Sequence, residues 1–330
     1  MPRSNAGTHG RAGPVALTPQ PERDEPRLAD PGLRDLSWSD STAIVKRAAK
    51  SSLADGITDL AAALAYYSFM AIPSVLLVAV GLFTLVASPA DITTLIDHIG
   101  RVVPASATSL LEDSLRRLSE RPSSSIVATV IGFVFALWST TGAMTAFMRA
   151  LNRAYDRVET RSFVRQRIVA LEMVVAMSVA FLLVFGLLVL GPALSHWIGG
   201  ALGMGSVFSW LWWILQWPVL LAGLLAVFAT MLYLGPDVEQ PRWQFLTPGA
   251  VLTTVVWLLA SGLFALYTAW FSSYNKAWGS LAAVVVLLTW LWLTALALIL
   301  GAEVNAETER SRELRRGEPA GERIQAPPKA

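Results

Sequence analysis

Glu303 is the residue of this chain whose position most clearly requires a chemical partner. It directly follows a long apolar stretch that ends at Ala302. At the end of a helix the dipole disfavours a carboxylate by about a few tenths of a kcal/mol or more, so Glu303 needs a cation. Six arginines lie between positions 149 and 167. We therefore predict a hydrogen-bonded ion pair between Glu303 and Arg149, Arg153 or Arg157, within a cluster that acts as a static clamp or as a gate: Arg149, Asn152, Arg153, Arg157, Glu303 and Asn305.

Two prolines interrupt other apolar stretches. Pro73 and Pro218 each break a helical hydrogen-bond ladder and free backbone carbonyls, which neighbours or water must satisfy. The strings around them, IPSVLL and WPVLL, resemble each other. One reading is an inverted repeat that builds a site near the middle of a membrane. The other is ordinary proline kinking and chance similarity between leucine-rich strings.

Further polar groups complete a candidate cavity or gate. Glu172 is the only carboxylate inside an apolar stretch, so it is either functional or pairs near the membrane surface with Arg165, seven residues earlier. Hydroxyl and aromatic groups either line a cavity or bond within and between helices. Lys276 either attracts an anionic group or anchors the chain at the interface. The candidate residues are Tyr66, Tyr67, Pro73, Trp138, Ser139, Glu172, Pro218, Asn275, Lys276 and Gly279.

The residue inventory argues against catalysis and cofactors. The chain has no cysteine, and its three histidines, at positions 9, 98 and 196, lack the spacing of metal ligands. No glycine-rich loop precedes a Lys-Ser or Lys-Thr pair, which nucleotide hydrolysis would need. We expect no catalytic residues, no metal site and no cofactor. The net charge of +2 does not indicate a nucleic-acid partner, because the excess cations lie where membrane topology requires them.

Six apolar stretches must position these residues. Each has at least 22 residues, enough for a helix to cross ~30 Å of hydrocarbon, and none contains Lys or Arg. The sequence therefore predicts an all-α integral membrane protein with six spans. They are Leu60–Ala87, Ile126–Phe147, Ile168–Leu190, Val207–Leu234, Leu246–Phe271 and Ala277–Ala302.

The distribution of cations predicts the orientation. Of the 26 Lys and Arg residues, 21 lie before the first span, between the second and third, between the fourth and fifth, or after the sixth. By the positive-inside rule both termini are cytoplasmic.

The polar segments complete the domain organisation. Residues 1–36, with many prolines and few aliphatic residues, are predicted to be a disordered cytoplasmic tail. The membrane domain covers residues 37–306 and begins with a basic amphipathic helix at Thr42–Leu53. Between the first two spans, Ser88–Ser125 has the apolar periodicity of two short amphipathic helices on the outer face, either a lid or a fixed cap. Residues 307–330 are a cytoplasmic C-terminal tail that we expect to fray.

Several short motifs, in order over residues 40–306, make the chain resemble the YihY/BrkB family of membrane proteins. They are DLAAALAYYS with Pro73, Trp138-Ser139, ALNRAY with Arg161, Leu232-Tyr233 with Pro236, TPGA at 247–250, YNKAWGS at 274–280 and GAEVNA at 301–306. The chain departs from the family at Trp278, where Tyr is usual, and at Leu234, where a basic residue is common. The resemblance implies a six-helix protein of the bacterial inner membrane. Some members carry the label ribonuclease BN, others virulence factor, and transport-like roles have been proposed for some.

Three functions follow from these observations. The leading expectation is movement of a solute or lipid across the inner membrane through a cavity near Pro73 and Pro218, with membrane lipids as partners. The alternative is a scaffold that organises envelope proteins or lipids without transport. A membrane-bound hydrolase or nuclease is disfavoured, because the carboxylates and histidines are scattered. Neither the substrate nor the oligomeric state follows from the sequence.

Overall fold

The computed structural model describes residues 38–86, 122–180, 183, 205–239, 244–270, 280–321 and 324–329. These residues form helices and connections, without a strand in the part described. The helices are α1 (Trp38–Ala54), α2 (Ile57–Val86), α5 (Pro122–Ala154), α7 (Gly205–Leu234), α8 (Pro248–Trp270) and α10 (Ser280–Arg316). A further helix spans 163–180. The predicted N-terminal tail and almost all of the predicted outer helices lie outside the described residues.

Four helical segments are long and apolar enough to cross a membrane: Val130–Ala154, Trp210–Leu234, Pro248–Thr268 and Leu281–Arg316. They correspond to the second, fourth, fifth and sixth predicted spans. The first predicted span falls on the 30-residue helix α2, which is apolar over Ile57–Pro73. The third begins in helix 163–180 and continues beyond the described residues. The helical membrane class is therefore supported, while the number of six spans stays a prediction.

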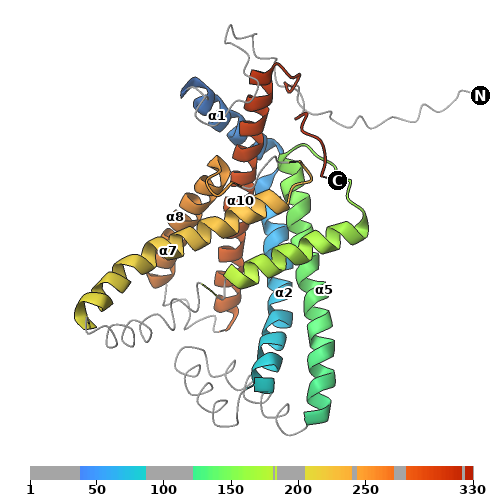
Figure 1. Ribbon diagram of the computed structural model, residues 1–330, viewed down its shortest axis with the longest axis vertical. Coiled ribbons are helices and arrows are strands. Elements are labelled where there is room, and N and C mark those ends of the chain that lie inside the picture. The colour runs from blue at the N-terminus through green and yellow to red at the C-terminus, as the bar shows by residue number, and fades with distance from the viewer. Residues whose placement is uncertain are drawn as a thin grey trace, which may run out of the picture.

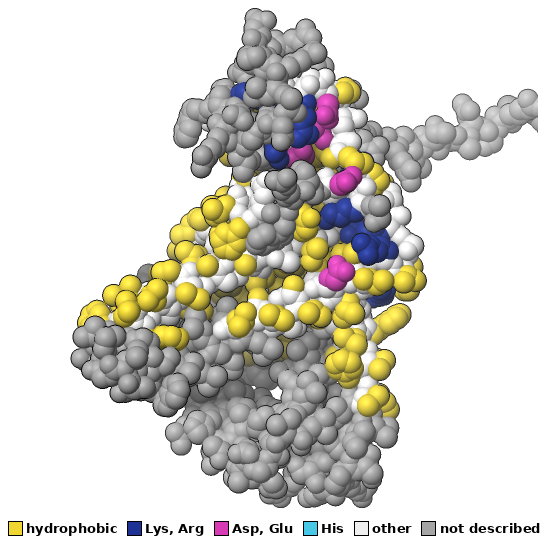
Figure 2. Space-filling model, in the orientation of Figure 1, with side chains coloured by type: hydrophobic (Ala, Val, Ile, Leu, Met, Phe, Trp, Pro, Cys, Tyr) yellow, Lys and Arg dark blue, Asp and Glu magenta, His cyan; other side chains and the backbone are white. Residues whose placement is uncertain are grey.

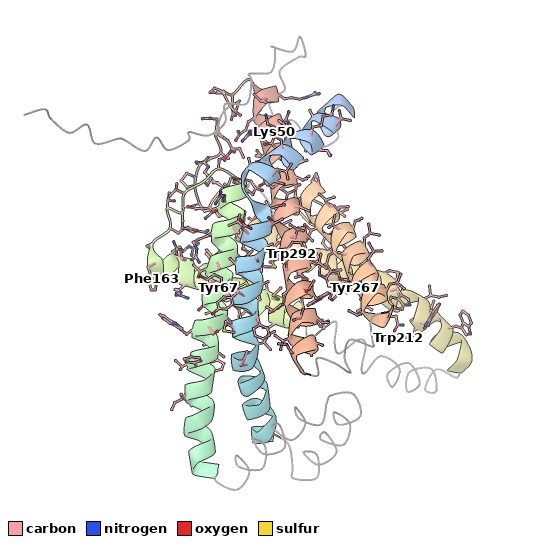
Figure 3. The ribbon with its side chains drawn as sticks, turned by 180° about the vertical axis from the view of Figure 1, so that it is seen from behind. Lys50, Tyr67, Phe163, Trp212, Tyr267 and Trp292 are labelled. Atoms are coloured by element: carbon pink, nitrogen blue, oxygen red, sulfur yellow. The ribbon has the colours of Figure 1, made fainter. Side chains whose placement is uncertain are left out.

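Helix α10 is the central element of the bundle, since it contacts each of the other five labelled helices. Helix α2 lies between α5 and α10 (Figure 1). In the view from behind, Trp292 on α10 lies beside α2, and its indole N–H donates to the carbonyl of Thr58 at 3.1 Å (Figure 3). Helices α7 and 163–180 run obliquely to this central group (Figure 1). The completely buried alanines show how closely the helices approach: Ala61, Ala170, Ala250, Ala297 and Ala302.

The start of α8 shows how sequence fixes one helix crossing. Thr247 caps the helix by accepting a hydrogen bond from the N–H of Ala250 (3.1 Å), and Pro248 occupies the first turn, where its missing N–H costs nothing. Gly249 lies against the backbone of Gly301 on α10, and a Cβ on Gly249 would overlap the Gly301 carbonyl oxygen. Asn305 accepts a hydrogen bond from the N–H of Gly249 at 2.8 Å and donates to Thr247. Asn305, predicted in the clamp with Glu303, thus joins α8 to α10.

Large apolar side chains cover much of the outer surface. Exposed examples include Phe133 and Phe135 on α5, Trp210 and Trp213 on α7, and Leu263 on α8. Figure 2 shows this apolar covering over α7, with charged side chains gathered towards the α1 end of the molecule. Apolar patches of this extent are rare on soluble monomers and are expected where lipid surrounds helices.

The C-terminal segment does not fray over its described part. Helix α10 continues to Arg316, well beyond the predicted end of the last span at Ala302. The chain then returns to the bundle, where Glu313 accepts hydrogen bonds from the N–H groups of Gln325 (2.8 Å) and Ala326 (2.7 Å). Ile324 is buried in the core. Composition alone predicted a loose tail, because it does not reveal that the buried carboxylate of Glu313 accepts hydrogen bonds from Gln325 and Ala326.

Candidate functional site

Asp237, which follows α7, joins three segments that are far apart in the sequence. Its Oδ2 accepts hydrogen bonds from the N–H (2.8 Å) and the hydroxyl (2.6 Å) of Thr160. Its Oδ1 accepts one from the N–H of Lys329 at 3.1 Å. The N–H of Asp237 in turn donates to Asn152 Oδ1 at 2.6 Å. A completely buried carboxylate is thereby satisfied on both oxygens.

Arg161 completes this network. Its Nε donates to Glu159 Oε1 at 2.5 Å and lies 3.7 Å from Asp237 Oδ1, while a terminal N–H donates to the carbonyl of Gly235 at 2.8 Å. Asn152 donates to the second oxygen of Glu159 at 2.8 Å. We call this group the Asp237 clamp: Asn152, Glu159, Thr160, Arg161, Asp237 and Lys329. A clamp was predicted here, but its acidic members are Asp237 and Glu159 rather than Glu303.

Two titratable groups of the clamp, Asp237 and Lys329, have shifted pKa values. Burial raises the pKa of Asp237, but the hydrogen bonds from Thr160, the charge of Arg161 and the N–H of Lys329 outweigh it, so the pKa lies below its usual range. Burial and, second, the nearby charge of Arg161 lower the pKa of Lys329 to about 8, although the charge of Asp237 opposes them. The Lys329 ammonium donates to the carbonyl of Tyr233 and lies 4.7 Å from the centre of that ring.

Glu303 is buried but unpaired, which contradicts the predicted ion pair. It is 1% exposed, and neither carboxylate oxygen has a hydrogen-bond partner among the described residues. The hydroxyl of Ser51 approaches without completing a hydrogen bond. The dipole argument fails because α10 continues past Glu303, so this residue does not stand at a helix end.

The arginines predicted to pair with Glu303 have other roles. Arg153 pairs with Asp55 at 3.3 Å, between α1 and α2. Arg157 donates to the backbone carbonyls of Ile324 (3.0 Å) and Ala326 in the C-terminal segment. Arg149 is exposed on α5. The partners of Arg153 and Arg157 come from segments whose folding the sequence did not indicate.

Three further carboxylates surround Glu303, and each has an arginine. Besides the Arg153–Asp55 pair, Arg310 pairs with Asp156 at 2.9 Å. Arg47 pairs with Glu307 at 2.6 Å. We call this group the Glu303 cluster: Arg47, Asp55, Arg153, Asp156, Glu303, Glu307 and Arg310. Crowding is evident at Asp156, since burial and the charges of Asp55 and Glu307 raise its pKa although Arg310 lowers it.

The polar residues predicted to line a cavity in the first two spans make local contacts. Tyr66 and Tyr67 are exposed on α2 and contact each other edge to face. Trp138 is also exposed, with the guanidinium of Arg167 4.7 Å from its ring centre. Ser139 is half-buried beside it. The neighbouring Thr140 and Thr141 donate to carbonyls of their own helix, as the alternative interpretation expected.

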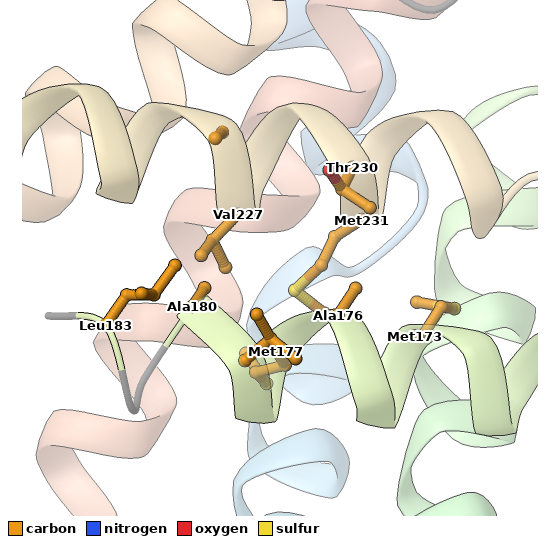
Figure 4. A pocket seen from close by; sticks show the side chains of 10 residues that line it. Met173, Ala176, Met177, Ala180, Leu183, Val227, Thr230 and Met231 are labelled. Carbon is orange, nitrogen blue, oxygen red and sulfur yellow. The ribbon is translucent and has the colours of Figure 1, made fainter.

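Neither Pro73 nor Pro218 lines the cavity that lies between helix 163–180 and α7. Both Pro73 and Pro218 are exposed, and α7 runs away from α2 (Figure 1). The cavity between helix 163–180 and α7 has a volume of about 140 Å³. Met173, Met177 and Met231 contribute to a lining in which Thr230 is the one polar side chain among the described residues (Figure 4).

The other predicted site residues are scattered. Glu172 is exposed on helix 163–180, and its charge acts on Lys329 of the C-terminal segment. Asn275, Lys276 and Gly279 lie outside the described residues. Sequence reasoning missed Glu159, Asp237 and Asp55; Asp237 stands next to Pro236 of the family-like string, which is the one signal that pointed to this position.

The helices and their apolar outer faces define a helical membrane protein. The chain matches the family model described as virulence factor BrkB over residues 48–325, and it belongs to this family. A relative from Bacillus subtilis (strain 168), named putative ribonuclease-like protein YfkH, is 32% identical over 216 residues, which are 66% of this chain and 78% of that protein.

Two further relatives carry the name UPF0761 membrane protein. The one from Chromohalobacter salexigens is 28% identical over 215 residues, 62% of this chain and 47% of the relative. The one from Idiomarina loihiensis is 26% identical over 197 residues, 56% of this chain and 62% of the relative. The chain thus spans about half the length of the Chromohalobacter protein. No solved structure matches the chain.

Proposed function

We propose that this protein moves a solute or a lipid across the bacterial inner membrane and that the Glu303 cluster takes part in the movement. The observation that supports this function is the buried, unpaired carboxyl of Glu303 beside the last span. A buried polar group without a partner costs free energy. Ionisable groups of this kind in membrane proteins commonly belong to substrate or ion pathways.

The orientation belongs to the same proposal. With both termini in the cytoplasm, the Glu303 cluster and the Asp237 clamp lie at the cytoplasmic side, where the chain carries most of its cations. The sequence predicted the functional region near Pro73 and Pro218. We propose instead that it lies at this end of the bundle. Membrane lipids are the expected surroundings, and no catalytic role is included. Metal-dependent RNA cleavage by the purified protein, abolished by a single carboxylate substitution, would overturn that exclusion.

The test compares lipids and metabolites in a strain that lacks the gene with the same strain carrying wild type, Glu303→Gln or Glu309→Gln. Glu309 is the matched control, because it lies on the same helix but is partly exposed and pairs with Arg312 at 3.1 Å. We expect one compound to change on deletion, to be restored by wild type and Glu309→Gln, and not by Glu303→Gln at equal expression. Identical profiles in all strains would contradict the proposal.

The Asp237 clamp favours a second function, a membrane scaffold. It fixes the connection after α5, the end of α7 and the C-terminal segment to one another through buried hydrogen bonds. Such a rigid end suits a docking platform for envelope proteins or lipids. Cross-linking in membranes distinguishes the two functions: a scaffold retains its cross-linked partners when Glu303 is replaced by Gln, and its loss of function follows clamp substitutions instead.

A further inference from the structure

Glu303 lies where four segments of the chain meet. Ser51 of α1 approaches it, Asp55 lies in the connection from α1 to α2, Asp156 follows α5, and Glu307 is one turn further along α10. Because Glu303 is 1% exposed and aimed into this cluster without a hydrogen-bond partner among the described residues, it differs from the surrounding acids, each of which has an arginine.

The charges of the cluster do not balance if Glu303 is ionised. The three arginines of the cluster, Arg47, Arg153 and Arg310, pair with Glu307, Asp55 and Asp156 respectively. Arg310 also lies 3.3 Å from Glu307. A fourth negative charge at Glu303 would be buried beside three carboxylates without a cation of its own. Like charges and desolvation both favour the neutral form of a carboxyl.

We propose that Glu303 is a proton-binding site, neutral while α1, the turn after α5 and α10 are packed as in this structure. A protonated carboxyl donates one hydrogen bond and needs only one acceptor, and the Ser51 hydroxyl is beside it. A metal ion would need several oxygen ligands. The described residues include no group of three or more His, Asp or Glu arranged to hold one.

The cluster also offers a route for the proton. Arg153 and Asp55 are its most solvent-accessible pair, with 52% and 21% of their side chains exposed, whereas Glu307 and Arg310 are buried. Opening the Arg153–Asp55 contact would admit water towards Glu303 between α5 and the start of α2. Tyr155, also buried, lies near enough to Glu303 and Glu309 to be affected by their charges. The use of the proton to drive transport rests on the proposed function, but its binding does not.

Infrared spectroscopy of the full-length protein in detergent tests the binding. Protonated carboxyls have a C=O band that ionised carboxylates lack. We expect wild type and Glu309→Gln to show this band near neutral pH. In Glu303→Gln the intensity of the band should fall by the contribution of one carboxyl group. Equal bands in wild type and Glu303→Gln would overturn the proposal. So would loss of the wild-type band on adding sodium at constant ionic strength, because a metal ion would then compete for the site.

A second measurement needs no substitution, in case Glu303→Gln does not fold. A hydrophobic carbodiimide reacts with protonated buried carboxyls, and mass spectrometry locates the adduct. Labelling of Glu303 near neutral pH, declining as the pH rises, supports the site; labelling of other carboxyls only would overturn it. If Glu303 is protonated but no compound changes in the deletion strain, the transport function is wrong and the proton-binding site stands. If a compound changes but Glu303 is not protonated, transport stands and the proton-binding site is wrong.

Discussion

Arg161 and Asp237 lie side by side in the interior, with 3.7 Å between Nε and Oδ1, although 76 positions separate them in the chain. The pair brings the connection after α5 against the end of α7. Removing one member of a buried ion pair leaves the other charge without compensation, which commonly costs about 3–5 kcal/mol. This contact should therefore be among the most sensitive in the protein.

We expect Asp237→Asn to lower the free energy of unfolding by about 3 kcal/mol, because Arg161 keeps its bonds to Glu159 but loses a second anion. Thermal unfolding of the purified protein in detergent measures the change. Glu239→Gln is the control: its side chain is exposed two residues away, so it removes the same charge outside the clamp. Equal unfolding temperatures for the two variants would show that the clamp does not stabilise the fold.

The same carboxylate predicts a dependence on pH. The pKa of Asp237 is lower in the folded protein than in the unfolded chain. Its contribution to stability is therefore complete above the unfolded value of about 4 and is lost as the pH falls through the folded value. The difference in unfolding temperature between wild type and Asp237→Asn should shrink as the solution is acidified below that range. A constant difference would contradict a lowered pKa.

The sequence predicted the elements better than the contacts between their ends. Apolar stretches placed α7 and α8 and the starts of α5 and α10 within a few residues, since a helix in lipid must satisfy its own backbone. They did not predict how far α5 and α10 continue beyond the apolar stretch, because the residues there are polar. The pairing of Glu303 could not be predicted in the same way. Of the arginines predicted to pair with it, Arg153 pairs with Asp55, and Arg157 donates to carbonyls of the C-terminal segment. Ion-pair partners depend on how the connections between helices fold, and the apolar periodicity of the sequence does not predict this.

Docking of the C-terminal segment depends on Glu313, a buried carboxylate that accepts two N–H groups. We expect Glu313→Gln to lose at least one of these bonds, at a cost of about 1–3 kcal/mol for an unsatisfied buried group. Hydrogen exchange at the amides of Gln325 and Ala326 should become faster, while the core of α10 is unchanged. Glu318→Gln, close by on the same segment, is the control. Unchanged exchange would mean that other contacts hold the segment.

The predicted orientation can be tested with reporter fusions. Fusions at Gly100 and Gly317 should report the outer and the cytoplasmic side respectively, because 21 of the 26 Lys and Arg residues lie in the segments predicted to be cytoplasmic. Alkaline phosphatase is active only outside, and green fluorescent protein fluoresces only inside. Two fusions that report the same side would contradict the six-span topology.

Gly249 and Gly301 permit the closest approach between α8 and α10, and neither position has room for a methyl group. The Cβ of Gly249→Ala would overlap the Gly301 carbonyl oxygen and the Asn305 side chain. The helices must then separate, and the bond from the Gly249 N–H to Asn305 is strained. We expect unfolding to become easier by about 1–3 kcal/mol, the usual effect of overpacking.

Gly262 on the same helix provides the matched control, because nothing lies within 4 Å of a Cβ built there. Gly262→Ala should leave stability unchanged or raise it by up to about 1 kcal/mol, since alanine is the better helix former. Thermal unfolding in detergent compares the two variants directly. If Gly249→Ala raised the unfolding temperature as Gly262→Ala does, α8 and α10 would not be in close contact at Gly249. The hydrogen bond from the Gly249 N–H to Asn305 would then not fix the position of Asn305.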